Sequence, residues 1–528
     1  MGGEWPVTFH AMPDIQRMNP SRICGVLGFL LLSVLSTPAF GRPPNIVFIL
    51  ADDMGYGDPA YAGGKIATPH LDRIAREGMN FTDAHTSSAV CTPTRYGILT
   101  GRYNWRSPMK KGVLNGFSKP LIPETRMTVA RLLGGAGYTS SVVGKWHLGL
   151  GWEKAGTPGQ KKGEGWDIDY TARLGGGPLA LGFTENFLFP ASLDMPPYVY
   201  LRNDIPLGVP TVTKSFKEPN RPGPATEDFE AADVLPDLAR EARAFIGREA
   251  ARKDKRFFLY LPLTSPHTPL VPSEAWQGKS GMGDYADFMM QTDWVVGEVL
   301  AELDARGVAE NTLLIFTSDN GCSPMAGIPE LAAKGHLVNG ALRGHKADIF
   351  EGGHRVPFLV RWPERVKAGS NCAATVCTTD FFATAAELAG AEIPDNAAED
   401  SFSMLPLLKG EDGFGRSYTI HHSINGSFAI RQGKWKLNLC PGSGGWSAPQ
   451  PGHATAGLHP VQLYDLDSDP GERDNLAVKQ AGRVNEMADL LAKAIRDGRS
   501  TPGAKQQNDG WPDTIPADVL ELLPQLKP

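Results

Sequence analysis

The sequence predicts an α/β protein in which a large mixed, mostly parallel sheet is sandwiched by helices, with a smaller C-terminal α+β domain. Two observations predict this. Continuous apolar runs alternate with helical patterns over roughly the first 400 residues, as in chains whose parallel strands are buried on both faces. Past about residue 410 the pattern changes to short strand-like pieces and then one helix, which is typical of a small antiparallel sheet covered by a helix.

The first predicted strand is the apolar run from Asn45 to Leu50, which ends in Ala51-Asp52-Asp53. An apolar run without polar alternation is typical of a strand that is buried on both faces. Three later segments are also predicted as strands: Tyr138 to Val143, Phe257 to Leu263 and the buried run Thr312 to Thr317. Because open α/β sheets bind their ligands at the carboxyl ends of the strands, we expect reactive residues directly after these runs.

Helices are predicted between the strands. Thr68 and Pro69 supply a cap and a first-turn proline for a helix that continues to Gly78. Three more segments have helical patterns: Met127 to Leu133, Leu235 to Ile246 and Ala286 to Leu303. The stretch from Gly151 to Pro224 is rich in glycine and proline, and we interpret it as long surface insertions around a pocket.

A chain of 528 residues exceeds one ordinary hydrophobic core. The patterns divide it into a leader (1–41), an N-terminal domain (42–410) and a C-terminal α+β subdomain (411–528). The last of these has strand-like pieces and one helix: Tyr418 to His421, Phe428 to Arg431, Trp435 to Leu439, Gln462 to Leu466, and the helix Val484 to Ile495. The net charge of −6, without a long run of one sign, does not suggest a nucleic-acid partner.

The N-terminus has the pattern of a signal peptide. Arg17 and Arg22 precede an apolar run from Ile23 to Leu35, and small residues, Ala39 and Gly41, follow it. A membrane span needs roughly 20 apolar residues, more than this run offers. We therefore expect cleavage near residue 41, a secreted or periplasmic protein and no stable membrane association. An uncleaved anchor is the alternative interpretation.

Six cysteines are present, and Cys24 would leave with the leader. Five is an odd number for an exported protein, so at least one cysteine is expected to serve a purpose other than pairing. Cys372 and Cys377 are close enough in sequence to pair, but the sequence leaves that question open.

Four clusters of residues that could carry chemistry lie far apart in the sequence, each at a predicted strand end or helix start. Cys91 stands before Pro93 at a predicted helix start, with Arg95 one turn later, and such a position favours anions. The carboxylate and amide oxygens after two strands are ligands that a hard cation prefers: Asp52, Asp53, Asp319 and Asn320. The other strand ends carry groups for charge balance and proton transfer: Lys145, His147 and His267. Taken alone, each cluster can also be interpreted as ordinary surface residues or as buried residues with a structural role.

Taken together, these motifs are similar to those of the type I, formylglycine-dependent sulfatases, which are arylsulfatase-like members of the alkaline phosphatase-like superfamily. The resemblance rests on an ordered set: Asp52-Asp53, Cys91-x-Pro93-x-Arg95, Gly144-Lys145-x-His147, His267, Asp319-Asn320 and Lys346. It extends from about Asn45 to Asp469-Pro470, nearly the whole mature chain. The family more often has serine where this chain has Thr94, and threonine keeps the hydroxyl.

The resemblance implies a sulfatase that hydrolyses sulfate esters of small molecules or, more specifically, carbohydrates. It implies that a formylglycine-generating enzyme or anaerobic maturase oxidises Cys91 to formylglycine (3-oxoalanine), whose hydrate is the nucleophile. It also implies one Ca²⁺ per chain, with Mg²⁺ as the alternative, held by five residues: Asp52, Asp53, Asp319, Asn320 and the converted Cys91. The remaining catalytic residues would be Arg95, Lys145 and Lys346 for charge balance, and His267 and His147 for proton transfer at the alcohol and at the nucleophile.

Two alternatives stay open from the sequence. One is a phosphodiesterase or phosphonate monoester hydrolase on the same scaffold, since phosphoryl and sulfuryl groups are similar in shape. The other is a catalytically inactive protein that binds sulfated glycans. The sugar, the position of the sulfate and the mode of action are not specified. Asp194, Tyr198 and Tyr200 either contact a sugar or pack the insertion that contains them.

Overall fold

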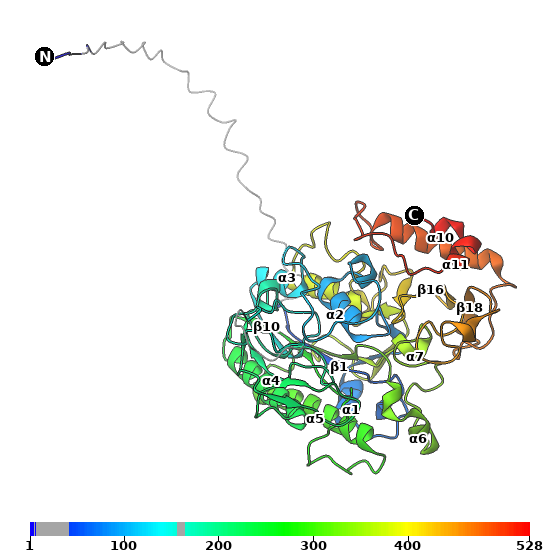
Figure 1. Ribbon diagram of the computed structural model, residues 1–528, viewed down its shortest axis with the longest axis horizontal. Coiled ribbons are helices and arrows are strands. Elements are labelled where there is room, and N and C mark those ends of the chain that lie inside the picture. Colours follow the sequence, from blue (N-terminus) through cyan, green and yellow to red (C-terminus); the bar gives the residue numbers. More distant parts are fainter. Residues whose placement is uncertain (5, 7–41, 156–163) are drawn as a thin grey trace. The chain divides into compact units, whose positions relative to one another are not determined.

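The computed structural model describes residues 1–4, 6, 42–155 and 164–528 (Figure 1). The predicted leader lies almost entirely outside the described residues. Residues Pro43–Pro528 form one compact unit, and all elements described below belong to it. Within the described part of the chain, no helix has the length and apolar character that a membrane crossing requires.

The main sheet has ten strands, and its central strand is β1 (Asn45–Ala51). β1 pairs in parallel with β10 (Arg256–Pro262) and β11 (Thr312–Ser318), and β4 (Tyr138–Lys145) extends the parallel part beyond β10. The other strands of this sheet are β13 (Ser370–Cys372), β2 (Met79–Phe81), β12 (Phe358–Arg361), β5 (Glu185–Phe189), β6 (Leu201–Arg202) and β7 (Ile205–Pro206). The predicted mixed, mostly parallel sheet is confirmed.

Helices cover both faces of this sheet, with α2 and α3 on one side of β1 and α1, α4 and α5 on the other (Figure 1). Successive side chains of β1 point to opposite faces of the sheet. Val47 and Ile49 pack in the core beneath α1 (Pro69–Glu77), α4 (Val234–Ala250) and α5 (Asp284–Ala305). On the opposite face, the ring of Phe48 lies 4.5 Å from that of Phe381 in α8 (Phe381–Ala389). Also described are α2 (Cys91–Thr100), α3 (Val129–Gly135), α6 (Ile328–Ala333), α7 (Glu351–His354) and α9 (Leu405–Lys409).

The interpretation of residues 151–224 as surface insertions was wrong for one part of this stretch. β5, β6 and β7 lie within it and form one edge of the main sheet, where β5 pairs in parallel with β4. The apolar run of β5 is only three residues long, Phe187 to Phe189, which is too short for its periodicity to stand out from the surrounding glycines and prolines. Two short strands, β8 (Val212–Lys214) and β9 (Gly223–Ala225), pair with each other nearby in sequence.

The C-terminal region contains the predicted antiparallel sheet. Its four strands are β15 (Thr419–His422), β16 (Phe428–Gln432), β17 (Trp435–Asn438) and β18 (Gln462–Asp465). The predicted helix is α10 (Ala481–Asp497), whose Met487 and Leu491 share a core with Ile430 and Leu437 of the sheet. A short helix, α11 (Ala517–Leu522), follows. β3 (Ala84–His85) pairs with β14 (Val376–Cys377) in a separate two-stranded sheet.

Backbone hydrogen bonds join this C-terminal sheet to two segments that carry predicted site residues. The amide of Ala89, two residues before Cys91, donates to the carbonyl of His422 at 3.0 Å. The amide of Ala347 donates to the carbonyl of Ala89 at 2.8 Å, and the amide of Ile424 donates to the carbonyl of Ala347 at 3.0 Å. The segment before Cys91 and the residue after Lys346 are therefore fixed by the end of β15.

All five described cysteines are free thiols. Cys372 and Cys377, which were candidates for a disulfide, do not form one: Cys372 lies on the edge strand β13, and Cys377 is buried in β14. Although the two cysteines are close in sequence, they lie on strands of different sheets.

Candidate active site

The carboxyl ends of four adjacent parallel strands meet at one edge of the main sheet. The strands lie in the order β11, β1, β10, β4. The residues at or after their ends are, in the same order, Asp319 and Asn320, Asp52 and Asp53, His267, and Lys145 and His147. This is the edge at which open α/β sheets form ligand crevices, and the structure brings the predicted residues together there.

Two buried carboxylates share two buried cations. Arg95 donates to Asp319 Oδ2 from Nη2 at 2.7 Å and from Nε at 3.0 Å, and its Nη2 lies 3.7 Å from Asp52 Oδ1. Lys145 Nζ donates to the other oxygen of Asp52 at 2.5 Å. Burial raises the pKa of Asp52, but the neighbouring cations, Lys145 foremost, lower it far below its ordinary value. Asp52 is therefore an anion in the folded protein.

Asp53 has its own buried cation. Lys346 Nζ lies 2.7 Å from Asp53 Oδ1 and donates to Oδ2 at 2.8 Å. Asn320 Nδ2 donates to Asp53 Oδ1 at 2.7 Å, and His267 Nε2 lies 3.6 Å from Oδ2. Burial lowers the pKa of Lys346, but the charge of Asp53 outweighs this and raises it. The lysine that follows no strand thus reaches the same edge of the sheet from a loop.

Cys91 is the first residue of α2 and is only 2% exposed. Its Sγ and one ligand atom each of Asp52, Asp53 and His267 all lie within 4.8 Å of one another. Burial raises the pKa of the thiol to about 11, so the unmodified side chain is neutral at physiological pH. Thr94, the position at which the family pattern differs, donates from Oγ1 to the carbonyl of Ser88 at 3.0 Å, a bond that a serine hydroxyl also makes.

His147, directly after β4, has an unpaired, buried ring nitrogen. Its Nε2 donates to the carbonyl of Leu114 at 2.8 Å; because a carbonyl only accepts, Nε2 carries the proton and Nδ1 has the lone pair. Nδ1 is buried and has no hydrogen-bond partner among the described residues. Burial, with Lys145 and Arg95, lowers the pKa of His147 well below its usual value, so the ring is a neutral base. Its φ of 57°, like the 68° of Asp53, is a strained conformation held by the surroundings.

Ser192 is a site residue that sequence reasoning missed. Its Oγ accepts from Lys145 Nζ at 3.1 Å and lies 3.2 Å from His267 Nδ1. It follows β5, the strand that was not predicted, by three residues. Recognition of β5 as a further parallel strand is the signal that could have pointed to Ser192, since the strand's carboxyl end lies beside that of β4.

The site contains buried acceptor oxygens that suit a cation. Asp52 Oδ1 and Asn320 Oδ1 have no hydrogen-bond partner among the described residues. A buried oxygen without a donor costs free energy, and a hard divalent cation prefers carboxylate and amide oxygens as ligands. The donor set formed by Asp52, Asp53, Asp319 and Asn320 therefore fits a divalent cation.

Two of the three loop residues considered for sugar contact, Tyr198 and Tyr200, are engaged in packing instead. Tyr198 is fully buried and its hydroxyl donates to the carbonyl of Arg221 at 2.5 Å. The hydroxyl of Tyr200 donates to Asp237 of α4 at 2.9 Å. Asp194 has a buried Oδ1 without a hydrogen-bond partner among the described residues, and its Oδ2 lies 3.9 Å from Arg221.

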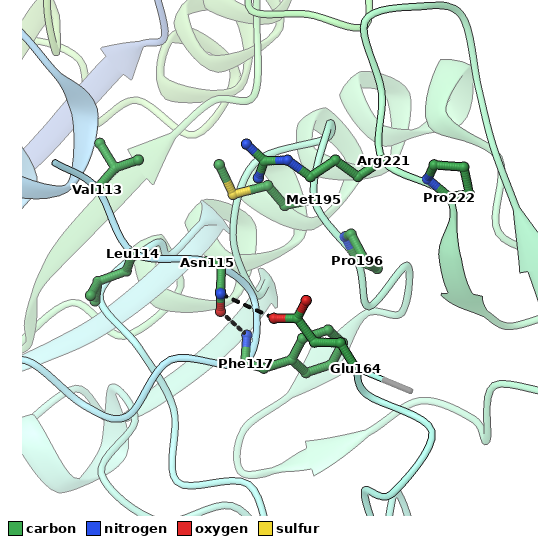
Figure 2. A pocket seen from close by; sticks show the side chains of 9 residues that line it. All are labelled: Val113, Leu114, Asn115, Phe117, Glu164, Met195, Pro196, Arg221 and Pro222. Atoms are coloured by element: carbon green, nitrogen blue, oxygen red, sulfur yellow. Dashed lines mark hydrogen bonds between the residues drawn. The ribbon is translucent and has the colours of Figure 1, made fainter. Parts of the chain in front are cut away.

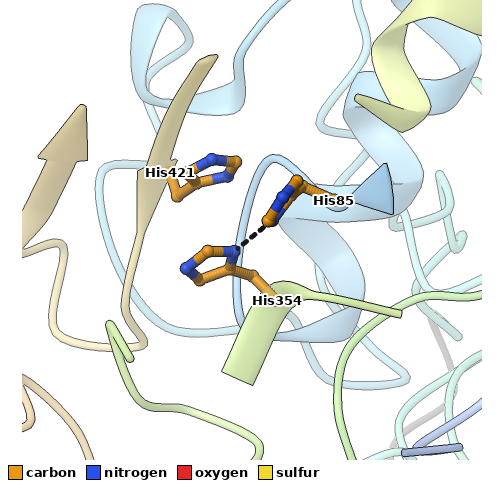
Figure 3. Close-up of side chains that lie close together, drawn as sticks. All are labelled: His85, His354 and His421. Atoms are coloured by element: carbon orange, nitrogen blue, oxygen red, sulfur yellow. Dashed lines mark hydrogen bonds between the residues drawn. The ribbon is translucent and has the colours of Figure 1, made fainter. Parts of the chain in front are cut away.

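A second buried cluster joins the C-terminal sheet to α7 and to the small two-stranded sheet that contains β3. It consists of His85, His354 and His421, which come from β3, α7 and β15 (Figure 3). His85 and His354 are hydrogen-bonded through their Nδ1 atoms at 3.1 Å. Lys436 Nζ lies 3.0 Å from His354 Nε2, and Arg431 Nη1 lies 2.8 Å from His85 Nε2. Because a lysine and an arginine already occupy the surroundings of the ring nitrogens, we assign this cluster a structural role.

This cluster predicts acid sensitivity of the fold. Burial lowers the pKa of His85, His354 and His421, and that of the neighbouring His422 to about 4. The unfolded chain, in which histidine has a pKa of about 6.5, therefore binds more protons as the pH falls. These histidines are expected to lower the free energy of unfolding as the pH falls from about 6.5 to about 4, by up to about 1.4 kcal/mol per pH unit each. Asp293, whose pKa burial raises to about 7, opposes this with the slope of one group.

Urea unfolding of purified protein at a series of pH values measures this slope. The variant H422Q removes one titrating group and should lower the slope by about 1.4 kcal/mol per pH unit. The control is H453N, because His453 is exposed and its replacement should leave the slope unchanged. An unfolding free energy that is flat between pH 7 and pH 5 would contradict the prediction.

Two family models match the chain. The sulfatase model matches residues 44–391, which is more than half of the chain, and the model of the C-terminal region of N-sulphoglucosamine sulphohydrolase matches residues 345–440. The first match includes every predicted site residue, and the second begins just before Lys346 and continues through β15 to β17.

Curated relatives match over most of their length. The chain is 34% identical to an N-acetylgalactosamine-6-O-sulfatase of Bacteroides thetaiotaomicron, over 85% of this chain and 93% of the relative. It is 33% identical to human arylsulfatase A, over 90% and 93%, and 34% identical to mouse steryl-sulfatase, over 93% and 88%.

Solved structures show the same fold. A sulfatase structure from a study of glycosaminoglycan metabolism by Bacteroides thetaiotaomicron superposes with a TM-score of 0.74 at 33% identity, and the match covers 86% of this chain and 99% of that one. A phosphonate monoester hydrolase of Agrobacterium radiobacter superposes with a TM-score of 0.54 at 19% identity, over 85% and 95%, which shows a shared fold alone. From the family model and the curated relatives, the chain is an enzyme and belongs to the sulfatase family.

Proposed function

We propose that this sulfatase removes sulfate from carbohydrate sulfate esters, with a nucleophile made from Cys91 by oxidation to formylglycine and with a divalent cation beside it. One observation carries the proposal: the sulfur of Cys91 shares a buried site with the ligand atoms of Asp52, Asp53 and His267, all within 4.8 Å of one another. The carbohydrate part is supported by the names of relatives, among them the N-acetylgalactosamine-6-O-sulfatase.

Four oxygen-donating residues would hold the cation: Asp52, Asp53, Asp319 and Asn320. Calcium fits this set of oxygen donors, and magnesium is the alternative. A bound divalent cation would lower the pKa of a hydroxyl on residue 91 and offset negative charge on the sulfate group.

The charges of the site suit an anionic reaction. The three carboxylates carry three negative charges, which are matched by the positive charges of Arg95, Lys145 and Lys346. A divalent cation would leave the site with two positive charges. A sulfate ester carries one negative charge and an ionised hydroxyl on residue 91 carries a second, so these charges would cancel. The complex would keep the single positive charge of a protonated His267 until that proton passes to the alcohol.

His147 and His267 are placed for two different proton transfers. His147 is a neutral base with a free Nδ1, as removal of a proton from a hydroxyl of residue 91 requires. His267 Nδ1 donates to the carbonyl of Thr268 at 2.6 Å, and its Nε2 faces Asp53, so Nε2 would deliver a proton to the departing alcohol. Formylglycine supplies a hydrated aldehyde with two hydroxyl groups, one to accept the sulfate and one to release it.

Mass spectrometry of the peptide that contains residue 91 tests the proposal. Conversion of cysteine to formylglycine makes this peptide lighter by about 18 mass units, the difference between a thiol-bearing carbon and an aldehyde. Converted protein should hydrolyse nitrophenyl sulfate much faster than the corresponding phosphate diester. Converted protein that prefers the diester would favour the phosphodiesterase alternative, and unconverted protein that is fully active would contradict the role of residue 91.

Export and maturation complete the proposal. The N-terminal signal peptide would deliver the enzyme to the periplasm or the exterior, and a formylglycine-generating or anaerobic maturase enzyme would convert Cys91. The pattern of Arg22, the apolar run and Gly41 supports the first, and the match of Cys91-x-Pro93-x-Arg95 supports the second.

Replacement of Ser192 by alanine is expected to lower kcat by roughly tenfold. The variant loses the hydroxyl that accepts from Lys145 and contacts His267. One hydrogen bond to a charged group contributes about 1.5 kcal/mol, which corresponds to about tenfold in rate. Because Ser192 positions these groups, KM for nitrophenyl sulfate should stay within about twofold. S192T, which keeps the hydroxyl, should recover part of the loss. A change in KM alone would contradict the positioning role.

A further inference from the structure

A cavity of about 390 Å³ lies next to the reactive residues. One wall comes from residues 113–117, and the opposite walls come from residues 195–196 and 221–222, with Glu164 at the rim (Figure 2). The volume is within the range of small-molecule sites, about 300–1,000 Å³. The polar groups that face the cavity belong to Asn115, Glu164 and Arg221.

Two connections place this cavity at the active site. The carbonyl of Leu114, in one wall, accepts from His147 Nε2 at 2.8 Å. The amide of Met195, in another wall, donates to the carbonyl of Ser192 at 2.8 Å, and the Ser192 hydroxyl bonds the ammonium of Lys145. A substrate whose sulfate reaches residue 91 would therefore extend its remaining atoms along these walls.

The two sides of the cavity differ in charge. Figure 2 shows Arg221 beside Met195, with Asn115 and Glu164 across from them. Asn115 Nδ2 donates to Glu164 Oε1 at 3.1 Å, which leaves Oε2 as an acceptor. The nearest described carboxylate to the Arg221 guanidinium is that of Asp194 at 3.9 Å, beyond hydrogen-bond distance, and the Arg221 side chain is 59% exposed. Its donors are thus available to a ligand.

We propose that this cavity binds the saccharide that carries the scissile sulfate, and that Arg221 binds a second anionic substituent of that saccharide. The inference rests on the proposed function. A guanidinium binds a carboxylate or a sulfate through paired hydrogen bonds, so the second anion is either a uronic acid carboxylate or another sulfate. Glu164 accepts from a sugar hydroxyl or amide, and the side chains of Phe117 and Met195 cover the apolar face of the ring.

The protein's net charge of −6 supports a role for Arg221 in binding an anion. A substrate with two anions is repelled by an acidic protein unless local cations offset that repulsion. Arg95, Lys145 and Lys346 are already paired with carboxylates, whereas the one carboxylate contact of Arg221 among the described residues is the long one with Asp194. Arg221 therefore distinguishes a saccharide with two anions from one with the scissile sulfate alone.

The test compares kcat/KM for three probes in protein with verified conversion of residue 91. The probes are a monosulfated N-acetylhexosamine, the same sugar with a second sulfate, and the same sugar linked to a uronic acid. We expect R221Q to lower the ratio of an anion-carrying probe to the monosulfated sugar by about tenfold, mainly through KM, and R221K to retain part of it. The control R252Q replaces an arginine of similar exposure, 51%, and should leave the ratios unchanged.

The outcomes separate the two levels of inference. A lower ratio for the disulfated probe identifies a sulfate as the second anion, and a lower ratio for the uronate probe identifies a carboxylate. If R221Q leaves both ratios unchanged while the native protein hydrolyses all three probes, the inference about Arg221 is overturned and the proposed function stands. If converted native protein hydrolyses none of the probes, the carbohydrate part of the proposed function fails. A folding defect would lower all rates together and leave the ratios unaffected.

Discussion

Replacement of Cys91 by serine is expected to abolish repeated turnover, with a loss in kcat on the order of 10⁴ or more. Cys91 stands at the start of α2 beside the acidic pair and His267, and the proposed nucleophile cannot be made from serine. A serine hydroxyl could accept the sulfate, but it has no second hydroxyl with which to release it. Steady-state rates with nitrophenyl sulfate measure the loss, and intact-mass spectrometry should detect protein that carries one added SO₃ group.

The matched control is C372S, which replaces a half-buried thiol on the edge strand β13 and should retain full activity. Circular dichroism and thermal unfolding of C91S should resemble those of the native protein, since serine is close to cysteine in volume. Turnover by C91S at more than a few per cent of the native rate would contradict a nucleophile derived from cysteine.

Removal of the divalent cation is expected to have the second largest effect. Chelation should lower kcat/KM by on the order of 10²- to 10³-fold, because the sulfate and the nucleophile would lose their main charge compensation. It should also lower the midpoint of thermal unfolding, since a ligand present at 100 times its Kd stabilises the fold by about 2.7 kcal/mol. Addition of calcium should restore both quantities, and magnesium at equal concentration serves as the comparison.

The variant D53N tests the same site without a chelator. Asparagine keeps the shape of Asp53 and an oxygen that accepts from Lys346 or Asn320, but removes one charge. We expect a weaker dependence of the unfolding midpoint on calcium as well as low activity. Full activity of the native protein after exhaustive chelation, with no metal detected by elemental analysis, would contradict the proposed cation.

The sequence predicted the central part of the fold because three of its four central strands, β1, β10 and β11, are largely apolar runs. β1, β4, β10 and β11 are buried on both faces, so burial alone made them recognisable. The polar residues after those runs were then expected at one edge of the sheet, where the structure places them. The positions of Asp52-Asp53 and Asp319-Asn320 could be predicted because each pair directly follows a buried strand in the sequence.

Other features depend on contacts between distant segments. Ser192 follows β5, whose short apolar core has no clear periodicity. The cluster of His85, His354 and His421 joins three segments that have no common motif. His147 Nδ1 is the free nitrogen because Nε2 donates to the carbonyl of Leu114. A contact with a backbone carbonyl cannot be predicted from a sequence pattern of side-chain types. Such contacts arise only from tertiary packing.

The burial of Cys91 limits when the proposed conversion to formylglycine can occur. In the folded protein the thiol is 2% exposed, so a second protein has no access to it. Ala89, two residues before Cys91, donates to His422 in β15, which lies about 330 residues later in the chain. At translation rates of about 5–20 residues per second, the ribosome needs about 15 to 70 seconds to synthesise those residues, and this hydrogen bond cannot form before then. If the modifying enzyme takes longer than this, the host would accumulate folded protein that still has cysteine at position 91. Such protein would stay inactive, because its buried thiol could no longer be converted.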